Sequence, residues 1–309
     1  MARFRVATTA ANLRRTPDAN GIIDAVFPQH HPVEEIGPKQ GAWHNVRGTL
    51  SGVSFTGFMK QTVLEAIPPA APASPAPATG LRPAHFGENN PQVTRTRTAG
   101  AAPLGEAGMP RRRGADGLAK EPLWAFVDWA EVENPANLRW KPGVFTFCNI
   151  YSHDYCYAAG VYLPRVWWMP SAIEALKAGQ AVPVAMGTTV REMNANSLHN
   201  WLLDFGGQFG WQRASSAEAL QEAANRGAVA VICARRTQTN RPGHITPVVP
   251  EGQGRRADRS GPVFLPLQSQ AGRVNVRFGT LGRQWWAKLG PNDFDSFVFF
   301  FNESASRWP

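Results

Sequence analysis

A proline- and alanine-rich stretch divides this sequence of 309 residues into two unlike parts. It reads PPAAPASPAPATG over residues 68–80 and holds no large apolar side chain. Such a composition favours extended polyproline II backbone and leaves little to bury in a core. The polar residues that follow have the same shortage, so we predict a flexible linker over 68–120. Two domains are therefore expected, over 1–67 and 121–309.

Short segments of alternating apolar and polar residues fill the first domain, from RFRVATTA to VSFTGFMK. Turn residues separate them, and several short strands at this spacing predict a small β-barrel. A set of positions carries a more specific pattern, namely Asn12, Arg14 or Arg15, Pro17, Trp43, Gly57 and Phe58. That pattern resembles the bacterial SH3-like domain. The resemblance implies a module that tethers an enzyme to cell-wall peptides, with a passive spacer as the alternative.

The second domain is expected to place helices before strands. Helical periodicity marks 121–133, a segment from Cys148 to Gly160, 171–179, 196–206 and 216–227. Asn196 or Ser197 is expected to cap the fourth helix, and Gly227 to close the fifth. Apolar strands are predicted at 228–236, 244–250, 262–272, 274–279 and 295–302. This order predicts an α+β domain with an antiparallel sheet.

Cys148 is the strongest candidate for a chemically reactive residue. The three cysteines, Cys148, Cys156 and Cys233, are too few for a disulfide framework. Cys148 follows Pro142–Gly143 and falls at the expected start of a helix, where the helix dipole favours a thiolate. It is thus a candidate nucleophile, a candidate metal ligand, or a buried core residue. Cys156 and Cys233 are predicted to lie in the core.

A metal site would join Cys148 to His153, Asp154 and Cys156. Structural zinc sites favour two cysteines separated by two to four residues, and no such pair exists here. No metal and no cofactor are therefore expected.

A nucleophilic cysteine needs a base and a polar group that orients the base. His244 follows a Pro-Gly turn and begins an apolar strand, which suits a base at the end of a sheet. Gln268 and Gln270 lie on one face of the next predicted strand, at period two. Either amide could orient the imidazole, and we favour Gln270 because a glycine turn follows it.

The motifs in this part of the chain follow the order of a known family. They are Cys148-Asn149 with Tyr151 and Asp154, Leu163-Pro164, Gly210-Trp211, Gly243-His244-Ile245 and Gln270-Ala271-Gly272. This order resembles the papain-like NlpC and CHAP cell-wall amidases and endopeptidases. The resemblance implies a papain-like domain with Cys148 as nucleophile, His244 as general base and Gln270 as the third group.

The implied substrate is an amide bond of bacterial peptidoglycan. Asn149, Trp167, Trp168 and Trp211 are predicted to contact it, with a hydrophobic core ridge as the alternative for the Trp167–Trp168 pair. The segment between Cys148 and His244 is longer than in compact members, which suggests an inserted helical region that shapes the groove.

The net charge of +9 and the pI of about 10.0 suit an acidic partner such as an anionic cell wall. A nucleic-acid binder remains the alternative from charge, although no nucleic-acid motif is present. A non-catalytic wall-binding protein with a degenerate hydrolase fold is the other alternative.

The sequence begins MARFRVATTAANLRR, without the apolar region of a signal peptide, and contains no run of 18 apolar residues. No membrane span is expected, and delivery to the wall of a target cell would need a non-classical route. A phage endolysin and a toxin injected by a type VI secretion system both fit. A toxin would imply an immunity protein as partner.

Overall fold

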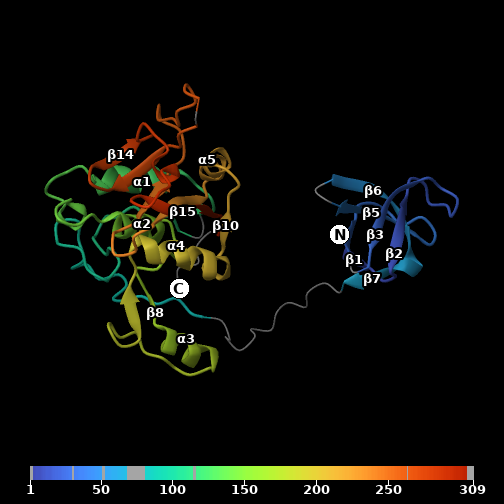
Figure 1. The fold of residues 1–309 in the computed structure, drawn as a ribbon, viewed down its shortest axis with the longest axis horizontal. Coiled ribbons are helices and arrows are strands. Elements are labelled where there is room, and N and C mark those ends of the chain that lie inside the picture. The colour runs from blue at the N-terminus through green and yellow to red at the C-terminus, as the bar shows by residue number, and fades with distance from the viewer. Residues whose placement is uncertain are drawn as a thin grey trace. The chain divides into compact units, whose positions relative to one another are not determined.

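The computed structural model describes residues 3–29, 31–50, 53–67, 81–113, 116–262 and 264–304. The chain divides into two compact units, Met1–Pro77 and Ala78–Pro309 (Figure 1). No helix in these described ranges is long and apolar enough to cross a membrane.

The first unit is built from short antiparallel strands, as the sequence predicts. They are β1 (Arg3–Val6), β2 (Ala10–Arg14), β3 (Ile23–Pro28), β4 (Pro32–Glu35), β5 (Trp43–Leu50), β6 (Val53–Lys60) and β7 (Leu64–Ile67). They pair in the order β3-β2-β6-β5-β4-β1-β7. Leu13, Phe27, Val46 and Met59 form the centre of the core. Gly48 is required there, because a Cβ atom at that position would lie 2.6 Å from the Phe27 ring.

The second unit combines five helices with an antiparallel sheet within the described residues, so the predicted α+β class is confirmed at that level. The helices are α1 (Glu121–Ala130), α2 (Cys148–Ala158), α3 (Pro170–Lys177), α4 (Ala195–Asp204) and α5 (Ala217–Asn225). The main sheet has the order β10-β15-β11-β12-β13-β14. Its strands are β10 (Trp211–Arg213), β11 (Val229–Arg236), β12 (His244–Val248), β13 (Gln268–Ala271), β14 (Asn275–Gly279) and β15 (Phe294–Asn302).

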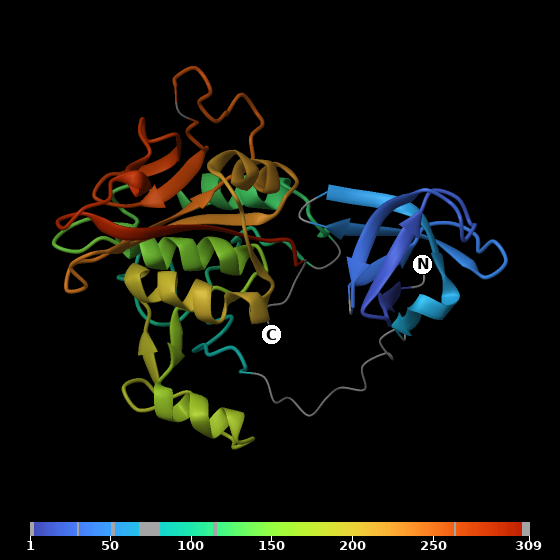
Figure 2. The ribbon, with the colours of Figure 1, turned by 45° about the vertical axis from the view of Figure 1, so that its right-hand side comes forward.

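Strand β11 divides its side chains between two cores because successive residues of a strand point to opposite faces. Val231 and Cys233 belong to the large core that α2 and α4 cover. Ala230 and Ile232 belong to a smaller core that α5 covers. Figure 2 shows α2 in green and α4 in yellow on one side of the sheet, and α5 on the other. The sheet is therefore buried on both faces, which explains why β11 is apolar at nearly every position.

The sequence did not predict a small two-stranded sheet in this unit. Strands β8 (Val166–Trp168) and β9 (Val190–Glu192) pair outside the main sheet, and together with α3 they project from it (Figure 1). Each has only three residues, too few for a pattern of period two to be visible. Helix α4 also differs from expectation at its start, because Asn194 caps it by accepting the Ser197 N–H at 2.9 Å.

Residues 81–113, which the sequence predicts to belong to a flexible linker over 68–120, instead form part of the second unit and pack into its core. Ala84 and Leu104 are fully buried in its large core. Arg112 is buried as well and donates to the carbonyls of Ala159 and Gly227. A few buried apolar residues are enough to hold this segment in place, because polar side chains such as that of Arg112 also form hydrogen bonds with backbone groups. Residues 68–80 of the predicted linker lie outside the described residues.

Candidate functional site

Cys148 is the first residue of α2, as the sequence predicts. The preceding residue, Phe147, has φ −120° and ψ 29° and so lies outside the helix. The helix proceeds into the core, and all of its residues except Asn149 are buried. Cys148 itself is 3 % exposed, at the edge of the core. The first amides of a helix have no acceptor within it, so the thiol lies where free N–H groups and the positive end of the dipole gather.

His244 begins β12 and faces this helix end. Its position depends on Gly243, where a Cβ atom would lie 2.5 Å from both the Ala234 carbonyl and the Asn196 side-chain oxygen. Asn196 fixes the loop before the histidine by donating to the carbonyls of Thr239 and Arg241, and its oxygen accepts the Arg236 N–H. The sequence did not single out Asn196 for this role.

The imidazole of His244 links Cys148 to Gln270. One ring nitrogen, Nε2, lies 2.8 Å from Gln270 Oε1. Gln270 Nε2 donates to the Val274 carbonyl at 2.8 Å, which orients the amide with its oxygen toward the ring. Nε2 therefore carries a proton, and the ring's Nδ1 is the nitrogen left to interact with the Cys148 thiol.

The two residues change each other's acidity. Burial opposes ionisation of Cys148, but the charge and hydrogen bond of His244, together with the Ile245 and Asn149 N–H groups, outweigh it and lower the pKa of the thiol. For His244, burial disfavours the charged ring, but the Cys148 charge and the hydrogen bonds to Cys148 and Gln270 raise its pKa. Both shifts favour a thiolate–imidazolium pair, the reactive form of a nucleophilic cysteine.

Gln268 and Gln270, which the sequence left as alternatives, have different surroundings. Gln268 is fully buried, and its Oε1 accepts from Thr246 Oγ1 at 2.9 Å and from Trp285 Nε1 at 3.0 Å. Of the two glutamines, only Gln270 has a hydrogen bond to His244. Between Gln268 and Gln270 the register of the β13–β14 pair shifts, so the simple alternation assumed from sequence does not hold there.

The three tryptophans that the sequence predicts in a substrate groove are core residues in the structure. Trp167, Trp168 and Trp211 are each less than 5 % exposed. Trp167 packs edge-on against Trp201, with ring centroids 5.6 Å apart. The indole nitrogens of the other two donate to backbone carbonyls, Trp168 to Arg82 and Trp211 to Tyr162. The core interpretation of this aromatic run is the one that the burial supports.

Asn149 is half-buried beside the thiol. Its side-chain amide donates to the Met193 carbonyl at 2.8 Å and so ties α2 to the segment before α4. Its predicted contact with substrate remains a prediction.

The acidic and imidazole groups near Cys148 in sequence have structural roles. Asp154 is fully buried and accepts two hydrogen bonds from Arg139, at 2.6 and 2.8 Å, and one from Trp140 at 3.1 Å. His153 is buried and donates from Nδ1 to the Leu163 carbonyl at 2.7 Å. Within the described ranges, no three His, Cys, Asp or Glu side chains come together in a way that could hold a metal ion.

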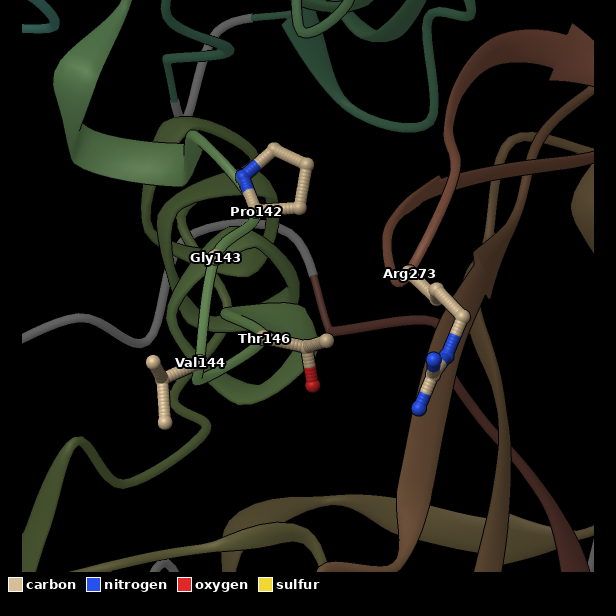
Figure 3. Close-up of a pocket in the computed structure, with 5 residues that line it drawn as sticks. All are labelled: Pro142, Gly143, Val144, Thr146 and Arg273. Atoms are coloured by element: carbon tan, nitrogen blue, oxygen red, sulfur yellow. The ribbon is translucent and has the colours of Figure 1, made fainter.

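Two adjoining hollows lie beside the site, and the sequence did not predict them. The first, of about 230 Å³, is lined by Pro142, Gly143, Val144, Thr146 and Arg273. Figure 3 shows Arg273 on one side of it and the residues that lead to Cys148 on the other. The second, of about 370 Å³, shares Pro142 and Arg273 and adds Glu133 and Lys141. The signal available in the sequence was position, since Arg273 follows Gln270 by three residues and Thr146 precedes Cys148 by two.

No family model and no curated protein matches this chain. Among solved structures, NlpC2 from Trichomonas vaginalis is similar to 96 % of this chain and 72 % of its own, with 11 % identity and a TM-score of 0.22. A TM-score of 0.22 is too low to establish a shared fold, so this likeness carries no conclusion about fold or activity.

Proposed function

We propose that this protein is a cysteine hydrolase that cleaves an amide bond of bacterial peptidoglycan. The observation that carries the proposal is a thiol at the N-terminus of a buried helix whose pKa the neighbouring His244 lowers, with the His244 ring hydrogen-bonded in turn to Gln270. A buried core cysteine gains nothing from a partner that lowers its pKa, whereas a nucleophile requires one.

In the proposed mechanism the Cys148 thiolate attacks the amide carbonyl carbon. A carbon–sulfur bond forms, and the carbonyl electrons move to the oxygen, which the Cys148 N–H at the helix start is placed to stabilise. Collapse of this oxyanion breaks the carbon–nitrogen bond, and the leaving nitrogen takes the proton from His244 Nδ1. Water then attacks the thioester carbonyl while His244 Nδ1 takes one of its protons, and collapse of this second tetrahedral oxyanion breaks the carbon–sulfur bond and releases the Cys148 thiolate. The products are an amine and a carboxylic acid, and the ion pair is restored.

Gln270 acts through His244 and is a positioning residue. Its oxygen holds Nε2–H and so keeps Nδ1 directed toward sulfur while the ring gains and loses its proton. Because Val274 holds the amide in turn, the positioning extends to the β13–β14 turn.

Peptidoglycan as the substrate rests on the resemblance to NlpC and CHAP hydrolases and on the net charge of +9. The first unit, with its short antiparallel strands, is proposed to be an SH3-like tether to the wall. The site of action is proposed to be the wall of a target cell, reached by phage lysis or by a secretion system. In the second case an immunity protein is the expected partner.

The test compares two cysteine variants on purified peptidoglycan. Cys148→Ala is expected to reduce the release of new amino termini at least ~10³-fold, because the nucleophile is lost. Cys156→Ala removes a buried thiol from the same helix and is the matched control for folding, so it should keep its activity. Mass spectrometry of the released fragments identifies the bond. Undiminished release by Cys148→Ala, with folding checked by circular dichroism, would contradict the mechanism.

A further inference from the structure

The hollow beside the site is framed by the two turns that deliver the reacting groups. One wall is the segment from Pro142 to Thr146, which runs directly into Cys148. The other wall is the turn after Gln270, where a Cβ atom at Gly272 would lie 3.4 Å from His244 Cε1. Arg273, the next residue, therefore begins beside the imidazole and lines the hollow opposite Thr146 (Figure 3). Cys148 and His244 do not line the hollow themselves, but Thr146, two residues before Cys148, and Arg273, which follows the glycine beside the imidazole, do.

The hollow is basic on its Arg273 side. Arg273 lines both hollows and Lys141 lines the second one; both are exposed, and neither forms an ion pair with an acidic side chain in the described part of the chain. Most other arginines near this sheet edge are paired, for example Arg255 with Asp128 at 3.0 Å. An unpaired guanidinium beside a reactive site is available to a ligand.

The shape and charge favour a carboxylate over a larger anion. A planar guanidinium binds a carboxylate through two parallel hydrogen bonds, and the Thr146 hydroxyl can supply a third donor. Glu133 lines the adjoining hollow and would repel an extended polyanion such as a nucleic acid. Its carboxylate is held in place there by the Arg277 N–H at 2.9 Å.

We infer that Arg273, assisted by Thr146, is a specificity-determining residue that binds a free carboxylate of the peptide substrate next to the bond that is cut. This inference rests on the proposed hydrolase function. It assigns the substrate class more narrowly, as a peptide that bears an unamidated carboxyl group close to the scissile amide.

The experiment compares purified peptidoglycan with the same material after its free carboxyl groups are converted to carboxamides. The full-length wild-type protein is expected to digest the native material about 10- to 100-fold faster, as loss of one hydrogen-bonded charge pair predicts. Arg273→Gln should digest both materials at a similar, reduced rate, through a raised KM with little change in kcat.

Arg213→Gln is the matched control. Arg213 is exposed on β10, at the opposite end of the main sheet from β14. Both variants lose one positive charge, so any general weakening of attraction to an acidic wall affects them equally. Arg213→Gln should retain the preference for native material.

The outcomes separate the two proposals. A preference that survives in Arg273→Gln, or a wild-type protein that digests both materials equally, overturns the carboxylate subsite and leaves the hydrolase standing. A wild-type protein that digests neither material overturns the hydrolase and the subsite with it.

Discussion

Helix α2 carries a cysteine near each end, and the pKa values of the two thiols are shifted in opposite directions. Cys148 lies at the N-terminus against His244, and its pKa is lowered. Cys156 lies two turns further on, fully buried, and burial raises its pKa well above the ordinary range despite the positive charge of Arg112. The sulfur atoms do not differ, so what differs is the partner and the position along the helix. A thiol becomes reactive where a protonated imidazole and free amides offset the cost of burying charge.

The C-terminal half of α2 is buried and contacts other parts of the core. His153, Asp154 and Cys156 point into the core, where each has a structural contact or a neutral environment. The N-terminal end instead adjoins exposed Val144 and Phe145. One helix thus spans from an anchored end inside the core to an end at the edge of the core, where the Cys148 thiol lies.

The largest expected difference between the two ends is in thiol reactivity. Cys148 should react with iodoacetamide at least ~10³-fold faster than Cys156, because a core thiol reacts only when the protein opens, which costs about 5 kcal/mol or more. As the pH is lowered, the alkylation rate of Cys148 should begin to decrease at a pH below about 8.5, the pKa of an ordinary thiol. The reason is that a lowered pKa keeps Cys148 ionised at lower pH.

Mass spectrometry of alkylated peptides over a pH series measures both effects. His244→Gln should move the inflection of the Cys148 profile to higher pH, because it removes the charge and the hydrogen bond that lower the thiol pKa. Equal labelling of the two cysteines in folded protein would remove the distinction between the two ends.

The next largest effect concerns the anchored end. Asp154→Asn leaves Arg139 buried without a counter-charge, at 1 % side-chain exposure, and should lower the free energy of unfolding by about 3–5 kcal/mol. Urea denaturation measures this, with Glu174→Gln, which removes an exposed ion pair to Lys177, as the control near zero. A loss below about 1 kcal/mol for Asp154→Asn would show that the pair does not hold this end of the helix.

The smallest effect is a pH dependence at His153, whose pKa burial lowers to about 4 from 6.5. Between pH 6.5 and pH 4 the unfolded state binds a proton at His153 and the folded state does not. The free energy of unfolding is therefore highest above pH 6.5 and decreases as the pH falls through this range. About 3 kcal/mol should be lost by pH 4. Urea unfolding at several pH values measures the slope.

His153→Asn is the matched variant for that slope, because its amide can still donate toward the Leu163 carbonyl but does not titrate. Its stability should fall less steeply between pH 6.5 and 4 than that of the wild-type protein. Identical slopes would mean that other groups cause the acid sensitivity.

Local pattern was enough to predict most elements of the fold. The helices at α1, α2, α3 and α5 and the strands β11 and β12 follow from periodicity and turn residues. The juxtaposition of Cys148 with His244 was predicted from order and residue type, although 95 residues separate them. Three-residue strands and the packed segment 81–113 were missed, because their stability comes from distant side chains such as Tyr162, which bonds to Ala84.

The sequence by itself determined where most of the helices begin, which cysteine lies at a helix start, and that a histidine opens a strand. These are local matters of backbone propensity and side-chain chemistry. Only the tertiary structure decided that Gln270 orients the imidazole while Gln268 does not, that Trp167 and Trp168 are core residues, and that Arg273 and Thr146 line one hollow. Each of these depends on strand register or on burial by distant segments, and neither can be inferred from a single sequence.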